Sequence, residues 1–498
     1  MTSSTRKYAP FIVFVAGLCF ITSLLFTIKK DVFFSGDAGL KYFMVKQISQ
    51  GGSFYTIDLD STTWVKEIWS QGFYPLKSPF VYDSPKGKIV SFPPAFQVIS
   101  AKLYKWFGFP GLYIVPCLSV LALWLSFIVL LKRAGVRQLN IAGGMLLLVF
   151  CSPLTVYAAF YWEHTLSTLL IFNAVAFLVK PPASSISAAA MGLLAGISVW
   201  FRPEILLFCG LFLIVMVYNN YRKYSFTNLV FIISALSGIT GFLLFNASVY
   251  GNVLGAHSYQ LMESERIIMG RENLADIAMH INARLLIYFP FMLLILLAVA
   301  YLTKRKRLPT VSWQLSMIVI VFLLITPLFL PNAGGKQWGP RYFLPLIPTA
   351  VTIFCLTIAE LKISLFKNRL LLSFLIPVVV YSLYVNVYLA YHTVRDDYAF
   401  RVKPGLDYLK GIPVDILVVQ NQYITQEFAA VTNRKKIFLA ENNNSFEKLL
   451  SLLKSAGVKR IIYMATDSDL IMRPPNLLTG KRSMKPAGGY YFAVYELR

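Results

Sequence analysis

The sequence predicts a polytopic α-helical membrane protein that carries a small α/β domain at its C-terminus. Hydrophobic residues make up 57% of the 498 residues, and charged residues make up 14%, against about 25% in soluble proteins. The apolar residues form long blocks, and about 20 such residues cross a bilayer as a helix. After about residue 396 these blocks give way to alternating strands and helices. We therefore expect a transmembrane domain over 1–396 and an α/β domain over 397–498.

The first apolar block, at about 9–28, is predicted to be a retained span because it lacks an Ala-x-Ala cleavage site. Ten further blocks bring the expected number of spans to about eleven. They lie near 112–131, 139–160, 165–179, 186–201, 205–218, 227–250, 285–302, 314–330, 343–360 and 370–391.

Every second turn between these blocks is rich in Lys and Arg, which collect in cytoplasmic loops. We therefore expect an integral protein of a bacterial cytoplasmic membrane, with a cytoplasmic N-terminus and an extracytoplasmic C-terminal domain. Much of the net charge of +24 follows from this topology, so no nucleic-acid partner is expected. The remaining charge suits anionic membrane lipids.

The first outer loop, about 29–110, is predicted to contain two interfacial helices. In the first, Leu40, Phe43, Met44 and Ile48 recur at helical spacing with polar residues between them. The second begins at Phe92-Pro93-Pro94, because proline favours the first turn of a helix.

Asp37 opens the first of these helices and has two interpretations. A carboxylate at the membrane surface can accept a proton from an acceptor hydroxyl. Alternatively, Asp37 is an N-cap that accepts hydrogen bonds from backbone N–H groups.

Ionisable residues at the other predicted outer ends are candidates for function, because their burial near apolar spans is costly. Glu163 and His164 follow two aromatic residues and are either interfacial residues or ligands of a divalent metal. Arg202 and Glu204 flank a proline and form either a structural ion pair or part of the site. A longer loop, about 251–284, adds His257, Glu263, Glu265, Arg266 and Arg271.

The segment 332–342 gives the second strongest signal in the chain. Its glycines allow backbone N–H groups to approach an anion, and Lys336 and Arg341 add positive charge for a phosphate. Trp338 and Tyr342 offer flat faces for a sugar or a prenyl chain. The alternative interpretation is an interfacial turn anchored by its aromatic residues.

The C-terminal segment shows strand patterns at 415–420, 436–440, 458–465 and 490–497. Asn444-Ser445-Phe446-Glu447 resembles a capping box and predicts a helix that ends before Gly457. The segment shows no Gly-rich phosphate loop, so we expect a docking or acceptor-recognition role.

Together these segments resemble the GT-C superfamily of polyprenol-phosphate-sugar-dependent glycosyltransferases, and within it the bacterial relatives of protein O-mannosyltransferases and aminoarabinose transferases. The resemblance covers nearly the whole chain. It is carried by Gly36-Asp37, Lys41-Tyr42, Phe92-Pro93-Pro94, Tyr161-Trp162-Glu163-His164, Arg202-Pro203-Glu204 and Trp338-Gly339-Pro340-Arg341-Tyr342. Protein O-mannosyltransferases have two adjacent acidic residues in the first loop, whereas here Ala38 follows Asp37.

The resemblance implies an inverting transfer of a sugar from a polyprenyl-phosphate donor to an acceptor hydroxyl on a lipid, glycan or protein. Asp37 would be the general base, and cationic side chains would hold the donor phosphate. No cofactor is required, although a divalent metal at Glu163 and His164 is an open alternative. The phosphate candidates are Lys336, Arg341, Arg202 and Lys41, and the substrate-binding candidates are Glu163, His164, Glu204, Trp338 and Tyr342.

Two other functions fit parts of the sequence. A lipid or small-molecule transporter would have broken helices, internal repeats and ionisable groups near the membrane midplane. A non-catalytic scaffold would explain the spans but leaves the acidic first loop without a role.

Overall fold

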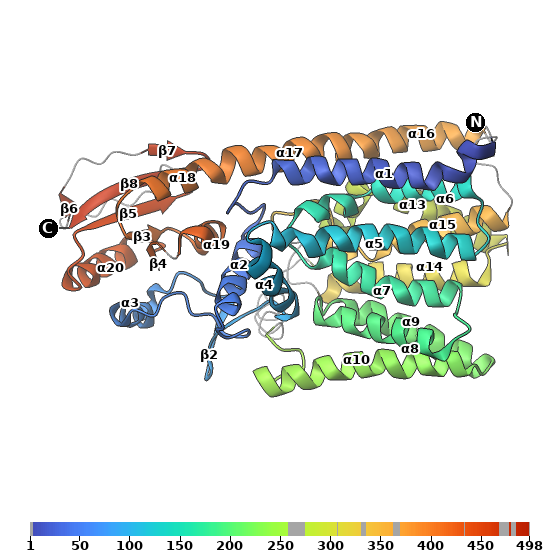
Figure 1. Cartoon of the computed structure of the whole chain (residues 1–498), viewed down its shortest axis with the longest axis horizontal. Helices are drawn as coiled ribbons and strands as arrows, with labels where there is room; N and C mark the ends of the chain where they lie inside the picture. The colour runs from blue at the N-terminus through green and yellow to red at the C-terminus, as the bar shows by residue number, and fades with distance from the viewer. Residues whose placement is uncertain are drawn as a thin grey trace. The chain divides into compact units, whose positions relative to one another are not determined.

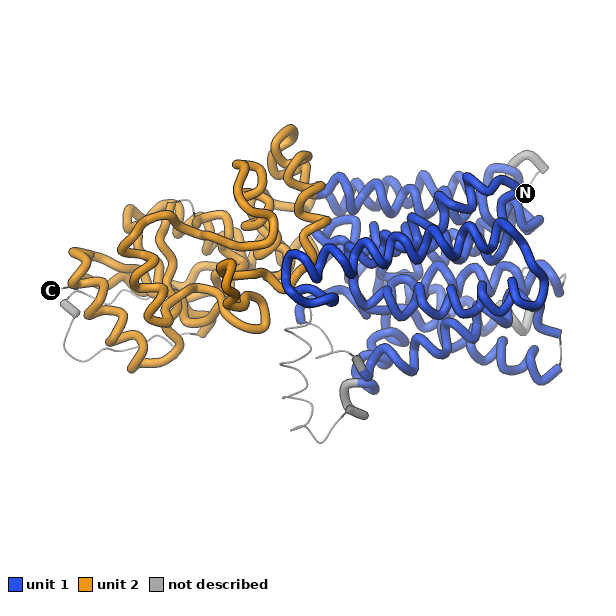
Figure 2. The backbone as a smooth tube through the Cα atoms, turned by 90° about the horizontal axis from the view of Figure 1, so that it is seen from below, with its two compact units in different colours: residues 1–26, 113–392 blue, residues 27–112, 393–498 orange. Residues whose placement is uncertain are grey.

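A computed structural model of the chain describes 3–256, 274–305, 307–329, 335–361, 369–432, 434–467, 478–479 and 485–497. It divides into two compact units (Figure 2). Unit 1 comprises Met1–Phe26 and Tyr113–His392, and unit 2 comprises Thr27–Leu112 and Thr393–Arg498.

Unit 1 consists of apolar helices that run side by side (Figure 1). Several are interrupted by short 3₁₀ or π turns, here given the symbol η. The elements are α1 (Ser3–Thr27), α5 (Gly111–Arg133), α6 (Gln138–Val149), η2 (Pro153–Ala159), α7 (His164–Val179), α8 (Ser185–Ile197), η3 (Ser198–Trp200), α9 (Ile205–Arg222), α10 (Phe226–Tyr250), α12 (Leu274–Tyr288), α13 (Phe291–Lys304), α14 (Thr310–Ile325), η4 (Thr326–Phe329), η5 (Arg341–Phe343), α15 (Leu346–Glu360), α16 (Arg369–Leu383) and η7 (Tyr384–Leu389).

Within the described residues, six helices are long and apolar enough to cross a membrane, or up to eight if each bent pair forms one span. Three shorter apolar helices, α7, α15 and the segment Ser185–Trp200, coincide with three further expected spans. These helices establish a polytopic membrane architecture, and the number of eleven crossings stays a prediction.

Two of the expected spans are not continuous helices. The block at 139–160 ends as an α-helix at Val149, and the chain bends by 56° before η2. The block at 285–302 bends by 99° between α12 and α13. A proline lies at each break, Pro153 and Pro290, where a ring without a backbone N–H removes a helical hydrogen bond.

Unit 2 combines the first outer loop with the C-terminal segment. The loop supplies α2 (Gly36–Ser49), α3 (Thr63–Ile68), η1 (Trp69–Phe73), β1 (Val81–Ser84), β2 (Gly87–Val90) and α4 (Ala95–Phe107). The C-terminal segment begins within the helical run 373–411, which contains α17 (Ala390–Asp396), η8 (Asp397–Val402) and α18 (Lys403–Gly411). It continues with β3 (Ile416–Val419), α19 (Gln422–Glu427), η9 (Ala429–Val431), β4 (Lys436–Leu439), α20 (Asn443–Ser455), β5 (Arg460–Ala465), β6 (Leu478–Thr479), β7 (Lys485–Ala487) and β8 (Tyr490–Leu497).

The sheet of the C-terminal segment has the strand order β4-β3-β5-β8-β6, and β7 also pairs with β8. β3 is parallel to both β4 and β5, so that Val418 lies between Phe438 and Tyr463. β8 is antiparallel to β5. All four expected strands are present, which confirms the α/β prediction for this segment.

The capping box of α20 lies two residues before the predicted one. Asn442 is the N-cap and accepts a hydrogen bond from Ser445 N, while Ser445 Oγ accepts one from Asn442 N. The predicted box, from Asn444 to Glu447, was therefore wrong, because a serine replaces the usual Glu or Gln at the third helical position.

Helix α2 is also more buried than its sequence pattern predicted. All eight residues from Ala38 to Val45 are buried, and the helix packs against both α4 and α19. A Cβ atom at Gly39 would lie 1.7 Å from the carbonyl oxygen of Gln426 in α19. The expected solvated face that includes Lys41 is therefore absent, and the Lys41 ammonium lies 4.6 Å from the centre of the Phe92 ring.

Helix α4 keeps an exposed face. Its buried residues are Phe96, Gln97, Ser100 and Ala101, whereas Ile99, Trp106 and Phe107 are exposed beside Lys102 and Lys105. Aromatic and basic residues of this kind are typical of helices at a membrane surface. The interfacial position of α4 stays a prediction.

Candidate active site

Glu163 and His164 lie where α7 begins, directly after the turn formed by η2. Glu163 is the N-cap position of α7, and both side chains are almost fully buried, at 2% and 3% exposure. The turn exists because Pro153 stands at the first position of η2, after Ser152. The break in the 139–160 block therefore brings two polar residues into the packed end of the unit.

Arg202 joins Glu163 to Glu204. Its Nη1 donates a hydrogen bond of 3.0 Å to Glu163 Oε1 and its Nε one of 2.6 Å to Glu204 Oε1, while Nη2 also contacts Glu204. Burial lowers the pKa of Arg202, but the two carboxylates outweigh this effect and raise the pKa. We call these three residues the buried charge cluster. They confirm the predicted pair of Arg202 and Glu204 and add Glu163.

Arg341 lies next to this cluster and is surrounded by aromatic side chains. Its guanidinium carbon is 5.8 Å from the centre of the Trp162 ring and 5.1 Å from that of Tyr342. Its Nη2 contacts the Tyr342 hydroxyl at 3.1 Å. Arg202 lies on the same Tyr342 ring, at 5.8 Å. Two of the predicted phosphate-binding arginines thus share one aromatic residue.

The turn before Arg341 depends on Gly339. This residue has a φ of +73°, and an added Cβ would lie 3.1 Å from both Pro153 and Tyr288. The preceding Trp338 packs edge-on against Tyr288, with ring centres 5.2 Å apart. The glycine therefore lets the turn reverse direction in close contact with η2 and α12.

Several buried polar atoms around this site have no hydrogen-bond partner among the residues that the structure describes. They are the hydroxyls of Tyr157 and Thr165, the indole nitrogens of Trp162 and Trp338, and Glu204 Oε2. Buried polar atoms are normally satisfied, and an exception calls for water, an ion or a ligand. The rings of Tyr157 and Trp162 also pack on His164, at 5.6 and 5.3 Å.

The metal alternative finds little support at this site. Across the described ranges, no group of three or more His, Cys, Asp or Glu side chains gathers as a ligand set would. The carboxylate of Glu163 pairs with the guanidinium of Arg202. The positive charge of this guanidinium would repel a divalent metal ion bound to Glu163. The ion pair with Arg202 makes Glu163 a poor ligand for a metal, and metal dependence stays an untested alternative.

Asp37 lies in the first turn of α2 and is half-buried. The N-cap position is taken by Ser35 in extended conformation, so the interpretation of Asp37 as the N-cap was wrong. Lys41 follows one turn later, is 1% exposed, and places its ammonium 4.6 Å from the centre of the Phe92 ring. Asp37 belongs to unit 2 and Arg341 to unit 1, and the role of Asp37 as general base stays a prediction.

Two predicted parts of the site remain undecided. Lys336 lies in an exposed bend, and its role at a phosphate stays a prediction. Gly334 and the acidic and basic residues of the 251–284 loop (His257, Glu263, Glu265, Arg266 and Arg271) lie outside the described residues.

Tyr157 and the site-facing role of Trp162 were not predicted. Tyr157 was assigned to the predicted span at 139–160, and Trp162 was treated as an aromatic residue at the membrane surface. Hydropathy alone does not distinguish a membrane span from a packed turn. The pair Ser152-Pro153 within the block is the signal that could have revealed the break.

Of the comparisons with known proteins, the one with solved structures informs on the fold. No protein-family model matches the sequence, and no curated protein sequence matches it. Among solved structures, ArnT from Cupriavidus metallidurans in the apo state matches with a TM-score of 0.55 and 13% identity, over 99% of this chain and 98% of that chain. An oligosaccharyltransferase from Archaeoglobus fulgidus, tethered with an acceptor peptide, matches with a TM-score of 0.46 and 12% identity, over 93% of this chain and 70% of that chain.

The similarity to ArnT, an aminoarabinose transferase, extends through both units and confirms the predicted resemblance at the level of the fold. The chain is an integral membrane protein that shares the fold of ArnT from Cupriavidus metallidurans.

Proposed function

We propose that this protein is a membrane glycosyltransferase that moves a sugar from a polyprenyl-phosphate donor to an acceptor hydroxyl, on the extracytoplasmic side and with inversion. The observation that carries this proposal is the match of almost the entire chain to ArnT. The clustering of Glu163, Arg202 and Arg341 beside unsatisfied polar atoms supports a polar ligand in unit 1.

In the proposed reaction, the carboxylate of Asp37 accepts the proton of the acceptor hydroxyl. The acceptor oxygen forms a bond to the anomeric carbon as the bond from that carbon to the phosphate oxygen breaks. Polyprenyl phosphate leaves with the bonding electron pair. Because attack and departure occur on opposite faces, a single displacement inverts the anomeric configuration, through an oxocarbenium-like state.

The leaving phosphate is a weak base, so it needs positive charge rather than a proton. Arg341 is the first candidate for this task, and it lies beside the Trp162 and Tyr342 rings. Arg202 is a weaker candidate, because two carboxylates neutralise its charge. A guanidinium can hold two phosphate oxygens at once. Lys336 is a second candidate, and Lys41 would orient Asp37 or contact the phosphate, since it lies four residues after Asp37 on α2.

The proposal is tested with purified protein in lipid, a panel of radiolabelled polyprenyl-phosphate sugars and a membrane extract as acceptor. Asp37→Asn removes the base, so its transfer rate is expected to fall by about 10²–10⁴. Asp407→Asn, which breaks an exposed ion pair with Lys403 in the same unit, is the matched control and should transfer normally. Full transfer by Asp37→Asn would exclude the general-base assignment.

Two further readouts test the mechanism in the same assay. The anomeric configuration of the product, measured by NMR, should be opposite to that of the donor. Transfer should continue in the presence of a strong chelator, because the ion pair with Arg202 makes Glu163 a poor ligand for a metal. Loss of transfer with the chelator, restored by added metal, would contradict that reading.

A transporter is the second candidate, because two helix pairs are bent, by 56° and 99°, and broken helices occur in transporters. Movement of a labelled lipid across the bilayer of proteoliposomes, without formation of a glycosidic bond, would favour this alternative over transfer.

A further inference from the structure

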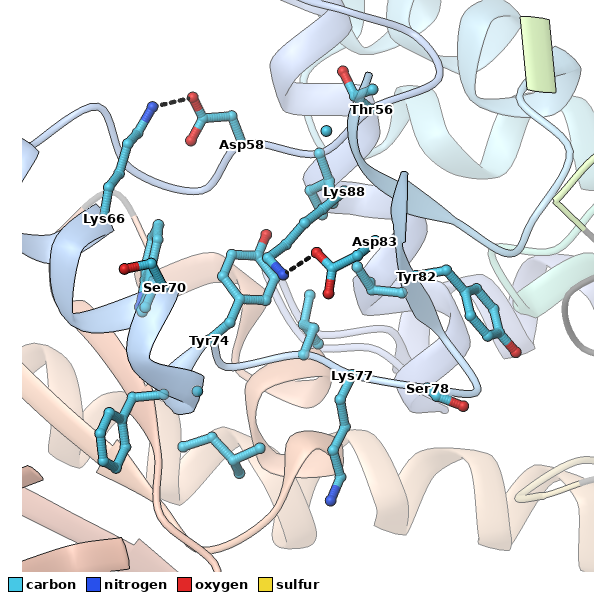
Figure 3. Close-up of a pocket in the computed structure, with 18 of the residues that line it drawn as sticks. Thr56, Asp58, Lys66, Ser70, Tyr74, Lys77, Ser78, Tyr82, Asp83 and Lys88 are labelled. Atoms are coloured by element: carbon cyan, nitrogen blue, oxygen red, sulfur yellow. Dashed lines mark hydrogen bonds and ion pairs between the residues drawn. The ribbon is translucent and has the colours of Figure 1, made fainter. Parts of the chain in front are cut away.

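Unit 2 contains a cavity of about 930 Å³, separate from the residues considered so far (Figure 3). Most of its lining comes from the first outer loop between Thr56 and Lys88, and the rest from Leu439, Glu441, Asn442 and Ser445 of the α/β domain. Small-molecule sites occupy about 300–1,000 Å³, so the cavity has room for more than one monosaccharide ring.

The two sides of this cavity are held together by bonds that are independent of any ligand. Trp69 Nε1 donates a hydrogen bond of 2.9 Å to the carbonyl oxygen of Ile437. Gln422 accepts a hydrogen bond from Lys77 N at 2.9 Å and donates one to Ser78 O at 3.0 Å. The cavity is therefore formed in advance, which reduces the entropic cost of binding.

Aromatic side chains line the cavity, among them Trp69, Phe73, Tyr74 and Tyr82. Tyr74 is 7% exposed, and its hydroxyl has no hydrogen-bond partner among the described residues. Figure 3 shows Tyr74 among the lining side chains beside Lys88, whose ammonium lies 4.5 Å from the centre of the ring. An apolar ring with an unused hydroxyl suits a ligand that has both C–H faces and hydroxyl groups.

Six of the seven charged side chains that line the cavity form three ion pairs, and the seventh is Lys86. Lys66 pairs with Asp58 at 2.7 Å, Lys77 with Glu441 at 2.5 Å and Lys88 with Asp83 at 2.6 Å. Two of these pairs are marked in Figure 3. Each pair keeps N–H donors and carboxylate acceptors side by side, which matches neighbouring hydroxyls of a sugar. An anionic ligand would have to compete with three carboxylates for the same lysines.

We propose that this cavity is a binding site for a neutral oligosaccharide. The aromatic residues would stack on sugar rings, the Tyr74 hydroxyl would bond one sugar hydroxyl, and the ion pairs would bond others. The proposal is argued from the cavity alone, so it does not depend on the proposed transfer reaction.

The test is saturation-transfer difference NMR on the purified full-length protein in nanodiscs. The probes are neutral trisaccharides of glucose, galactose, mannose and N-acetylglucosamine, with trigalacturonic acid as the anionic comparison. At least one neutral trisaccharide should receive saturation in a concentration-dependent way.

Two variants localise the binding. Tyr74→Phe removes only the hydroxyl and should weaken binding about three- to tenfold, the range expected for one hydrogen bond. Ser70→Trp places a bulky ring at an exposed lining position and should abolish binding without disturbing the core. Tyr408→Phe in α18, outside the cavity lining, is the matched control and should bind as the wild type does.

Three results would overturn the proposal. These are the absence of binding by all neutral probes, binding of trigalacturonic acid alone, and neutral binding that both Tyr74→Phe and Ser70→Trp leave unchanged. Loss of transfer activity with intact trisaccharide binding would instead reject the proposed enzymatic function and leave this site in place.

Discussion

The ion pairs at Arg202 in unit 1 are buried, whereas those between the first loop and the α/β domain in unit 2 are accessible. In unit 1, the side chains of the buried charge cluster are between 2% and 11% exposed. In unit 2, the pairs between the first loop and the α/β domain are more accessible, with Lys77 and Glu441 at 49% and 44% and Lys436 and Asp60 at 28% and 18%. The same chemical groups therefore have different energetic roles in the two units.

Burial explains the difference. An exposed pair gains about 0–1 kcal/mol because water and salt screen it. A buried pair has lost its hydration, so removal of one partner leaves a charge that the interior cannot stabilise. Unit 2 is stabilised by its sheet, its apolar core and the hydrogen bonds between the side chains of Trp69 and Gln422 and backbone groups. The stability of unit 1 near Arg202 depends instead on the balance of buried charges.

The largest effect is expected from Arg202→Met. This change leaves Glu163 and Glu204 buried without their cation, which should destabilise the protein by about 3–5 kcal/mol. Thermal unfolding in detergent measures the change. Arg222→Met, at an exposed arginine of the same unit, should have little effect, and equal stability of the two variants would contradict the role of the cluster.

A companion variant separates charge balance from shape. If Arg202→Met is combined with Glu163→Gln and Glu204→Gln, no unpaired charge remains, and much of the lost stability should return. A triple variant as unstable as the single one would show that the geometry of the arginine, rather than its charge, maintains this end of unit 1.

Arg341→Gln should affect rate instead of stability. If Arg341 stabilises the leaving phosphate, its loss should lower transfer by about 10²–10³, with an unfolding temperature close to that of the wild type. Arg137→Gln, at an exposed position before α6, is the control for both assays. A loss of stability equal to that of Arg202→Met would place Arg341 within the structural cluster.

In unit 2, packing rather than charge should decide stability, and Gly39→Ala tests this. The added Cβ would meet the backbone oxygen of Gln426, so α2 and α19 must separate, at a cost of about 1–3 kcal/mol. Gly411→Ala, where no atom lies within 4 Å of an added Cβ, is the matched control. Equal unfolding temperatures would show that α19 is free to shift.

Sequence reasoning succeeded where the determining contacts were local. The strands β3, β4, β5 and β8 were predicted from short apolar runs, and the pair of Arg202 and Glu204 from a spacing of two residues. It failed where the partner was distant. The burial of α2 depends in part on α19, about 380 residues later in the chain, which helical periodicity cannot reveal.

The same distinction explains why the residues of the candidate site were predicted but their pairing was not. Glu163, Arg202, Arg341 and Tyr342 were each predicted as candidates, and the structure brings them together. The pairing of both carboxylates with Arg202 could not be predicted, because it depends on which carboxylate faces which guanidinium after folding. The role of Asp37 as a base is still a prediction.

The smallest effect is expected at Asp60, whose carboxylate accepts hydrogen bonds from Thr62 and pairs with Lys436. Burial raises the pKa of Asp60, but the bonds from Thr62 and Lys436 prevail and lower it. A lowered folded-state pKa means that this stabilisation is complete above the unfolded pKa of about 4 and is lost as the pH falls through the folded-state pKa. Asp60→Asn should therefore cost up to about 1 kcal/mol at pH 7, and its difference from the wild type should be smaller at pH 3. Unfolding curves at both pH values measure this, and a constant difference between the two proteins would show that Asp60 acts through its hydrogen bonds alone.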